Sequence, residues 1–163
     1  IEFGNFIDET FPKLVAYAPY INSVRWMLIR FAIAGHYFKT KNYNAALTII
    51  NELMDAKDIE LRKDIQAHTR MMYLILHFEL KNTLILESIT RSVKRYLQQN
   101  ENYFVTERVF IKHFNILIYS TNSAAADKII NELKVEVVEI FESNINEKIA
   151  FTTMPLSHWL DLY

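Results

Sequence analysis

Apolar side chains recur every three or four residues along most of this chain, which is the period of one face of an α-helix. The pattern predicts helices, since strands place apolar residues at every second position. Four stretches carry it most clearly: Trp26, Ile29, Ile33 and Tyr37; Leu47, Ile50 and Met54; Leu86, Ile89, Val93 and Tyr96; and Ile130, Leu133, Val137 and Phe141. The β-branched residues at 135–138 also suit a strand, but the surrounding period favours a helix there.

Short polar breaks divide this pattern at a regular interval. Asn42, Asn82 and Asn122 each follow a long helical run and are 40 residues apart. Asparagine adopts the left-handed conformation that ends a helix more readily than most residues do. A fixed period with one turn in each unit predicts stacked helical hairpins that bury their apolar faces on one another. We place the hairpins at about 20–56, 59–97 and 103–143, within a single all-α domain over residues 1–163.

The composition supports helices and excludes several kinds of site. The chain has 163 residues with 2 Gly, 3 Pro and 0 Cys, where average usage would supply about eleven Gly and about eight Pro. A phosphate-binding loop needs several glycines close together, and thiol catalysis, disulfides and thiolate metal sites need cysteine. Gly35 lies inside a predicted helix beside Ala34, where close packing would favour the lack of a side chain.

Charge and hydropathy narrow the choice of partners. The chain carries 18 Lys and Arg against 19 Asp and Glu, a net charge of −1, whereas nucleic-acid-binding domains usually have a basic excess. The longest strongly apolar stretch, residues 71–76, is far shorter than the roughly 20 residues that span a bilayer. We therefore predict no nucleic-acid or membrane partner and, without a visible secretory signal, a cytoplasmic location by default. Because the chain begins at Ile1 instead of Met, we expect it to be part of a longer polypeptide.

Residues 33–50 resemble one unit of the tetratricopeptide repeat. In that family, neighbouring large and small residues and a tyrosine on the first helix precede an aromatic, a small and a large residue after the turn. The corresponding residues here are Ile33, Ala34, Tyr37, Tyr43, Ala46 and Ile50. The departures are Arg30 where the family usually has Trp, Asp58 where a proline often ends the repeat, and a period of 40 residues instead of 34.

The resemblance implies a right-handed stack of about three antiparallel hairpins, a tetratricopeptide-like α-solenoid of the kind found in many divergent bacterial proteins. Such repeats bind a peptide or a partner protein on a concave face built from the first helix of each hairpin. On this register the face comprises Phe31, Phe38, Lys39, Met71, Ile75, Phe78, Arg108, Ile111 and Asn115. The alternative for the apolar members is core packing between the hairpins.

A basic edge is the second candidate for binding. Arg91 and Arg95 are four residues apart and share one helix face, where they would suit a phosphate, an acidic peptide or a terminal carboxylate. Glu87 lies four residues before Arg91 and offers an ion pair within the helix as the alternative.

No catalytic or metal-binding set emerges from the sequence. The five histidines, His36, His68, His77, His113 and His158, include no pair spaced i, i+4, so we interpret them as core or surface residues. No nucleophile–base pair or phosphate cradle is present either, and neither an enzyme nor a cofactor is predicted.

Two functions follow: an interaction scaffold, or a structural or regulatory segment of a larger protein with no ligand of its own. The C-terminal segment 151–163, with Pro155 opening a short helix, is expected to cap the apolar end of the last hairpin. Packing of this segment on another domain or subunit is its alternative, and self-association through the terminal hairpins is the further partner prediction.

Overall fold

The computed structural model describes residues 2–55, 63–99, 104–120, 122–152 and 155–163. Every regular element in these ranges is helical, which confirms the all-α prediction for the described part of the chain, including residues 135–138. In chain order the elements are α1 (Glu2–Tyr17), the 3-10 helix η1 (Ala18–Tyr20), α2 (Ser23–Lys39), α3 (Tyr43–Asp55), α4 (Lys63–Glu79), α5 (Thr83–Gln99), α6 (Val105–Leu117), α7 (Ser123–Ser143), α8 (Ile145–Thr152) and α9 (Pro155–Asp161).

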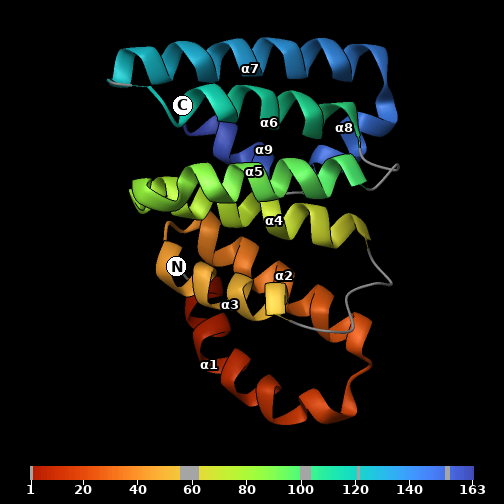
Figure 1. The fold of residues 1–163 in the computed structure, drawn as a ribbon. Helices are drawn as coiled ribbons and strands as arrows, with labels where there is room; N and C mark the ends of the chain where they lie inside the picture. Colours follow the sequence, from red (N-terminus) through yellow and green to blue (C-terminus); the bar gives the residue numbers. More distant parts are fainter. Residues whose placement is uncertain (1, 56–62, 100–103, 121, 153–154) are drawn as a thin grey trace.

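Helices that follow one another in the chain pack as pairs, and the pairs lie in layers (Figure 1). α2 packs on α3, α4 on α5 and α6 on α7, while α3 contacts α4 and α5 contacts α6 to join the layers. α1 lies at one end of the stack and α7 at the other (Figure 1). The right-handed, tetratricopeptide-like superhelix remains a prediction beyond this arrangement.

Lysine, and not the predicted asparagine, takes the left-handed conformation in the first two tight turns. Lys41 has a φ of 61° and Lys81 a φ of 60°. In the first turn, the Asn42 amide donates to the Tyr37 carbonyl over 2.8 Å, and the second turn has the equivalent bond at 3.0 Å. This hydrogen bond, which spans five residues, defines a Schellman motif whose left-handed residue comes just before the amide donor. Our assignment of the reversal to the asparagines was therefore wrong by one position in these two turns.

The asparagines serve the next helix or the turn itself. Asn42 Oδ1 accepts the Ala45 amide over 3.4 Å, and Asn122 caps α7 in the same way at 2.9 Å. Such N-caps satisfy amide groups that have no partner within the helix. The Asn82 side-chain amide instead donates to Nδ1 of His77 over 2.9 Å. Burial lowers the pKa of His77, and its ring is thereby kept neutral and able to accept this bond.

Close contact between α2 and α3 depends on small residues. Ala34 and Gly35 of α2 and Ala46 of α3 are buried, and the two alanines have no exposed surface. The short side chains let the helix backbones approach, and Phe38 and Ile50 fill the surrounding space. The small residues at these positions therefore allow the close contact between α2 and α3.

A carboxylate from α8 caps the beginning of α6. Glu147 Oε1 accepts the Val105 amide over 2.7 Å, while Oε2 accepts the Thr106 amide over 3.1 Å and the Thr106 hydroxyl over 2.8 Å. Phe104, at the N-cap position itself, offers no side-chain bond. Glu147 is 4% exposed, and a buried carboxylate that accepts three hydrogen bonds at a helix N-terminus stabilises that end strongly. The cap ties the last layer to the segment that follows it.

We expect Glu147→Ala to lower the free energy of unfolding by about 2 kcal/mol, because it removes an N-cap and leaves buried donors without an acceptor. Urea denaturation measures this change. Glu142→Ala, on the exposed end of α7, is the matched control and should stay within about 0.5 kcal/mol of the natural protein. Equal stability of the two variants would show that the cap contributes nothing.

Candidate functional site

The structure divides the nine residues predicted for the concave face between core and surface. Phe31, Phe38, Met71, Ile75 and Ile111 are buried, Phe78 is half-buried, and Lys39, Arg108 and Asn115 are exposed. The buried apolar residues on α2 and α4 pack in the core, which was the alternative to a place on an open concave face. Only Arg108, Ile111 and Asn115, all on α6, lie together at a groove.

The C-terminal helix contacts one part of the face that we had expected to be open, at Phe78 of α4. α9 packs on α2 and α8, and its Trp159 is fully buried. The indole contacts Phe78 of α4 and Phe110 and Phe114 of α6, with ring centroids 6.2, 5.9 and 6.0 Å away. In Figure 1, α9 lies behind α5 and α6, at the level where these two helices meet. We call this covered side of α2, α4 and α6 the inner face.

One carboxylate fixes the orientation of α9. Glu79, at the end of α4, accepts the Trp159 indole N–H over 2.7 Å and the Tyr163 hydroxyl over 2.8 Å, both on Oε1. Burial, and then the hydrogen bond to Glu79, raises the pKa of Tyr163 above its usual value. The phenol therefore stays protonated and remains a donor.

The segment predicted to cap the last hairpin does contact it, through Phe151 on Phe141 of α7 and Trp159 on Phe110 and Phe114 of α6, and it also reaches α2. α8 packs on α7 and α6 and covers part of that end, whereas α9 turns back to the first helix pair. The reason is chemical. Trp159 needs both an aromatic pocket and an acceptor for its N–H, and the inner face supplies both.

A groove of about 440 Å³ runs between α5 and α6 on the outside of the stack. It is lined by Lys94, Leu97, Gln98, Arg108, Ile111, Lys112, Asn115 and Ile116. The α6 members are spaced i, i+3, i+4, i+7 and i+8, so they form one stripe of that helix. We call this the basic groove.

The basic groove combines cations with apolar surface. Lys94 of α5 and Arg108 and Lys112 of α6 are all exposed, and the described lining residues include no carboxylate. Leu97 and Ile111 are buried, whereas Ile116 keeps 52% of its surface exposed. The groove thus offers an apolar contact beside a local positive charge, although the chain as a whole has a net charge of −1.

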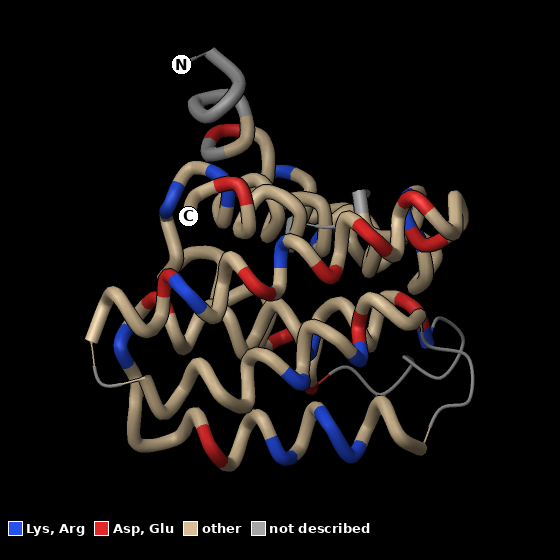
Figure 2. Tube along the Cα trace, turned by 90° about the horizontal axis from the view of Figure 1, so that it is seen from above, with Lys and Arg blue, Asp and Glu red and all other residues tan. Residues whose placement is uncertain are grey.

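The predicted basic edge adjoins this groove. Arg91 lies one turn before Lys94 on α5 and pairs with Glu87 over 2.6 Å. This is the ion pair within the helix that we gave as the alternative to ligand binding by Arg91. Arg95 is exposed next to Lys94. Figure 2 shows that basic and acidic residues otherwise alternate over much of the fold. Arg95 therefore adds a positive charge beside the groove, whereas Glu87 offsets the charge of Arg91.

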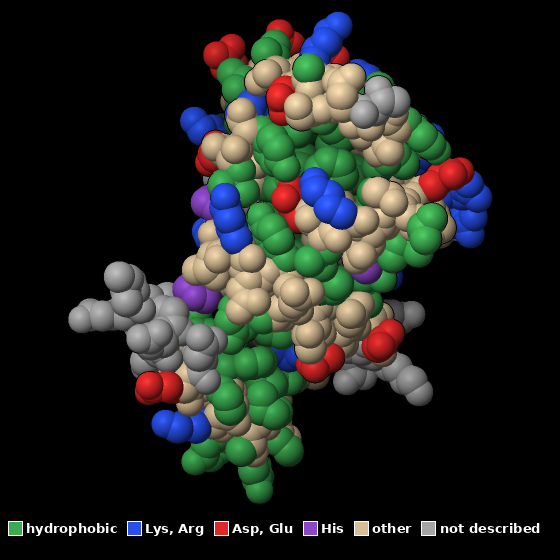
Figure 3. Space-filling view, turned by 90° about the vertical axis from the view of Figure 1, so that its left-hand side faces the viewer, with side chains coloured by type: hydrophobic (Ala, Val, Ile, Leu, Met, Phe, Trp, Pro, Cys, Tyr) green, Lys and Arg blue, Asp and Glu red, His purple; other side chains and the backbone are tan. Residues whose placement is uncertain are grey.

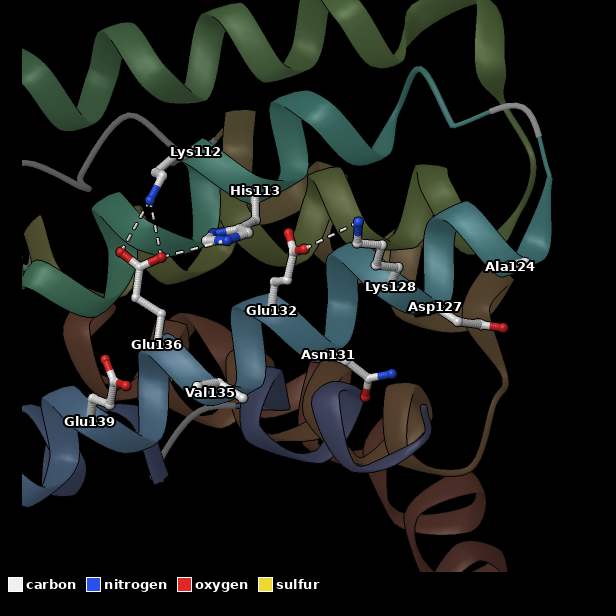
Figure 4. Close-up of a pocket in the computed structure, with 10 residues that line it drawn as sticks. All are labelled: Lys112, His113, Ala124, Asp127, Lys128, Asn131, Glu132, Val135, Glu136 and Glu139. Atoms are coloured by element: carbon white, nitrogen blue, oxygen red, sulfur yellow. Dashed lines mark hydrogen bonds and ion pairs between the residues drawn. The ribbon is translucent and has the colours of Figure 1, made fainter.

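A second, wider groove, which we call the acidic groove, lies along α6 and α7 (Figure 4). Its volume is about 1080 Å³, and it is lined by Lys112, His113, Ala124, Asp127, Lys128, Asn131, Glu132, Val135, Glu136 and Glu139. Four carboxylates and two lysines give these residues a net negative charge. Lys112 also lines the basic groove, so this side chain marks the boundary between the two.

Glu136 joins the two walls of the acidic groove. Its carboxylate accepts from Lys112 Nζ over 3.0 and 3.2 Å and lies 3.5 Å from His113 Nε2. In Figure 4, Lys112 and His113 both point toward it. The other His113 nitrogen, Nδ1, bonds the Val109 carbonyl over 3.0 Å and must carry the proton, because a carbonyl only accepts.

The lining residues that the structure describes include no hydroxyl or thiol that His113 could activate. Another buried pair, His68 Nε2 and Glu107 Oε1, lies 3.2 Å apart between α4 and α6 and is almost closed to solvent. Within the described ranges, no three metal-binding side chains come close enough to hold an ion.

Sequence reasoning missed two parts of this region. The stripe 108, 111, 112, 115 and 116 is visible as a helical pattern, but its partner wall on α5 depends on how two layers meet. Nothing local to Glu79 or Trp159 indicates a contact across 80 residues.

No protein-family model matches the chain, and no curated protein or solved structure matches it. Among the helices in the described ranges, none has the length and apolar character needed to cross a bilayer.

We expect Trp159→Ala to lower the free energy of unfolding by about 3–5 kcal/mol, as for other buried aromatic residues. Trp159→Phe keeps most of the packing but loses the hydrogen bond to Glu79, and its loss should be about 1–3 kcal/mol. Urea denaturation followed by circular dichroism tests both. Stability unchanged in Trp159→Ala would show that α9 does not hold the inner face.

We also expect the Tyr163 phenol to make stability fall at high pH. Since its pKa is raised on folding, the unfolded chain loses this proton first, near its usual value of about 10. The stabilisation is complete below that pH and is lost as the pH rises further. Burial also raises the pKa values of Tyr43 and Tyr96, so the test compares the pH dependence of stability in Tyr163→Phe with that in the natural protein. Tyr163→Phe should show a smaller loss than the natural protein between about pH 8 and about pH 10.5, and an equal loss would contradict this.

Proposed function

We propose that this protein is a non-enzymatic interaction module that binds a segment of a partner protein in the basic groove between α5 and α6. The observation that carries the proposal is the contrast between two surfaces. The inner face is covered by α9, while the basic groove is open and combines cations with exposed apolar surface. The groove replaces the inner face as the binding surface.

The dimensions of the groove suit a few side chains of a bound segment. Its volume of about 440 Å³ lies within the range of pockets that recognise small ligands or anchor residues. Ile116, half exposed at its edge, would lose its remaining contact with water on binding. Burial of such a side chain contributes about 25 cal/mol per Å².

The groove is also held in shape before any partner arrives. α6 is capped by Glu147 at its first turn, and Phe110 and Phe114 anchor its opposite side on Trp159. A preformed surface loses little conformational entropy on binding. The resemblance of residues 33–50 to a tetratricopeptide unit, together with the consecutive helix pairs, supports the finer proposal of a helical-repeat scaffold.

Site-specific photocrosslinking tests the proposal. A benzophenone side chain at Asn115, in the groove, should give discrete crosslinks to a partner in extracts of the source cells, and the same probe at Asn51 of α3 is the matched control. Ile116→Asp should reduce the Asn115 crosslinks about tenfold or more, because it places a charge on the apolar contact. Equal crosslinking from Asn115 and Asn51 would refute binding in the groove.

A structural segment of a larger assembly is the second candidate, favoured by apolar side chains at both ends of the stack. Figure 3 shows such side chains on the surface over α1, and those at 40% exposure or more include Val15, Tyr17 and Tyr20 at this end and Val135, Val138, Ile145 and Ile149 at the other. Exposed apolar surface of this kind suits stacking on further helices.

If the α7–α8 end self-associates, sedimentation should show dimers at high protein concentration, and Val138→Lys with Ile149→Lys should abolish them. Leu84→Lys is the control, because Leu84 is 97% exposed on α5 and belongs to neither end. A monomer at every concentration, or the same loss with Leu84→Lys, would count against association through this end.

A further inference from the structure

We infer that the basic groove binds an acidic amphipathic helix, with carboxylates one helical turn apart on either side of an apolar residue. This inference rests on the proposed function and adds the chemistry of the partner. It uses the charge, the apolar contact and the spacing of the same lining residues.

The charge of the basic groove is the first property that selects a partner. The described lining residues include three cations and no anion. Lys112 pairs with Glu136 in the neighbouring groove, and Lys94 and Arg108 lie on opposite walls of the basic groove. A carboxylate placed between those walls interacts with both helices, and the arginine can bind it through two parallel hydrogen bonds. A basic partner would meet repulsion from both sides.

The apolar contact is the second property, and it distinguishes a peptide ligand from a simple polyanion. Ile116 presents exposed hydrocarbon beside the cations, while Leu97 and Ile111 line the groove but are buried. The exposed apolar surface adds affinity only if the ligand brings an apolar side chain. The lining residues that the structure describes include no aromatic side chain, so they offer no platform on which single-stranded nucleic acid could stack its bases. The combination favours a protein segment that alternates acidic and apolar groups.

The spacing of the cations on α6 is the third property. Arg108 and Lys112 are four residues apart on α6, which places them about 6 Å apart along the helix axis. A partner helix that lies along the groove presents its own residues i and i+4 at the same separation, with apolar residues at i+3 or i+7 on the same face. Asn115 of α6 and Gln98 of α5 add amide groups to the lining of the groove, where they can bond polar side chains.

The experiment uses four labelled peptides of about 15 residues, near the shortest length at which a helix persists in water. The first carries Glu at i and i+4 with Leu at i+3 and i+7. The second replaces Glu by Gln, the third replaces Glu by Lys, and the fourth has the composition of the first with Leu moved to the opposite face. Fluorescence anisotropy with the full chain gives each Kd.

We expect the first peptide to bind at least about tenfold more tightly than each of the other three, and to weaken between about 50 mM and about 200 mM salt. Lys94→Glu and Arg108→Glu should each weaken it about tenfold. Lys13→Glu, which makes the same charge change at an exposed site on α1, should leave it unchanged. Thermal melts of each variant exclude unfolding as the cause.

Three results would overturn the inference. Equal binding of the Gln peptide would show that the carboxylates are not recognised, and equal binding of the peptide with displaced leucines would show that any polyanion suffices. A single-stranded oligonucleotide that competes as well as the acidic peptide would identify nucleic acid instead. If Asn115 crosslinks a partner while no acidic peptide binds, the proposed function stands and this inference alone fails. If neither is observed, both fail.

Discussion

The arrangement of surfaces in this protein depends on one buried interaction, the insertion of Trp159 beside the carboxylate of Glu79. The indole contacts rings on α4 and α6 and donates its N–H to Glu79, and its helix also packs on α2. Because α9 covers this side, the first helices do not offer it to a partner. The surfaces that stay open are on the outside of the stack, where neighbouring layers meet.

α6 is the helix on which these surfaces converge. It contacts α9 through Phe110 and Phe114, and Glu147 caps its first turn. Its exposed residues form the basic groove toward α5 and part of the acidic groove toward α7. Lys112 lines both and pairs with Glu136, so this ion pair separates two regions of opposite charge on a nearly neutral chain.

Features that depend on neighbours in the chain could be predicted from sequence, and features that join distant segments could not. The helical class follows from the apolar period, and Ala34 and Ala46 mark the contact of α2 with α3. The left-handed residue was misplaced by one position because Asn is intrinsically more tolerant than Lys there, while the Schellman hydrogen bonds select the preceding residue. Glu147 and Trp159 gave no local signal, since their partners lie about 41 and 80 residues away. The groove needed the meeting of α5 and α6.

The return of α9 also changes how the stack can come apart. In an array where each hairpin contacts only its neighbours, an end unit can open while the rest stays folded. Here the last helix touches the first, second and third helix pairs. Because one helix contacts all three pairs, we expect the opening of one pair to disturb the packing of the others, so that the three pairs unfold together. One tryptophan thus joins helix pairs that otherwise contact mainly their neighbours in the chain.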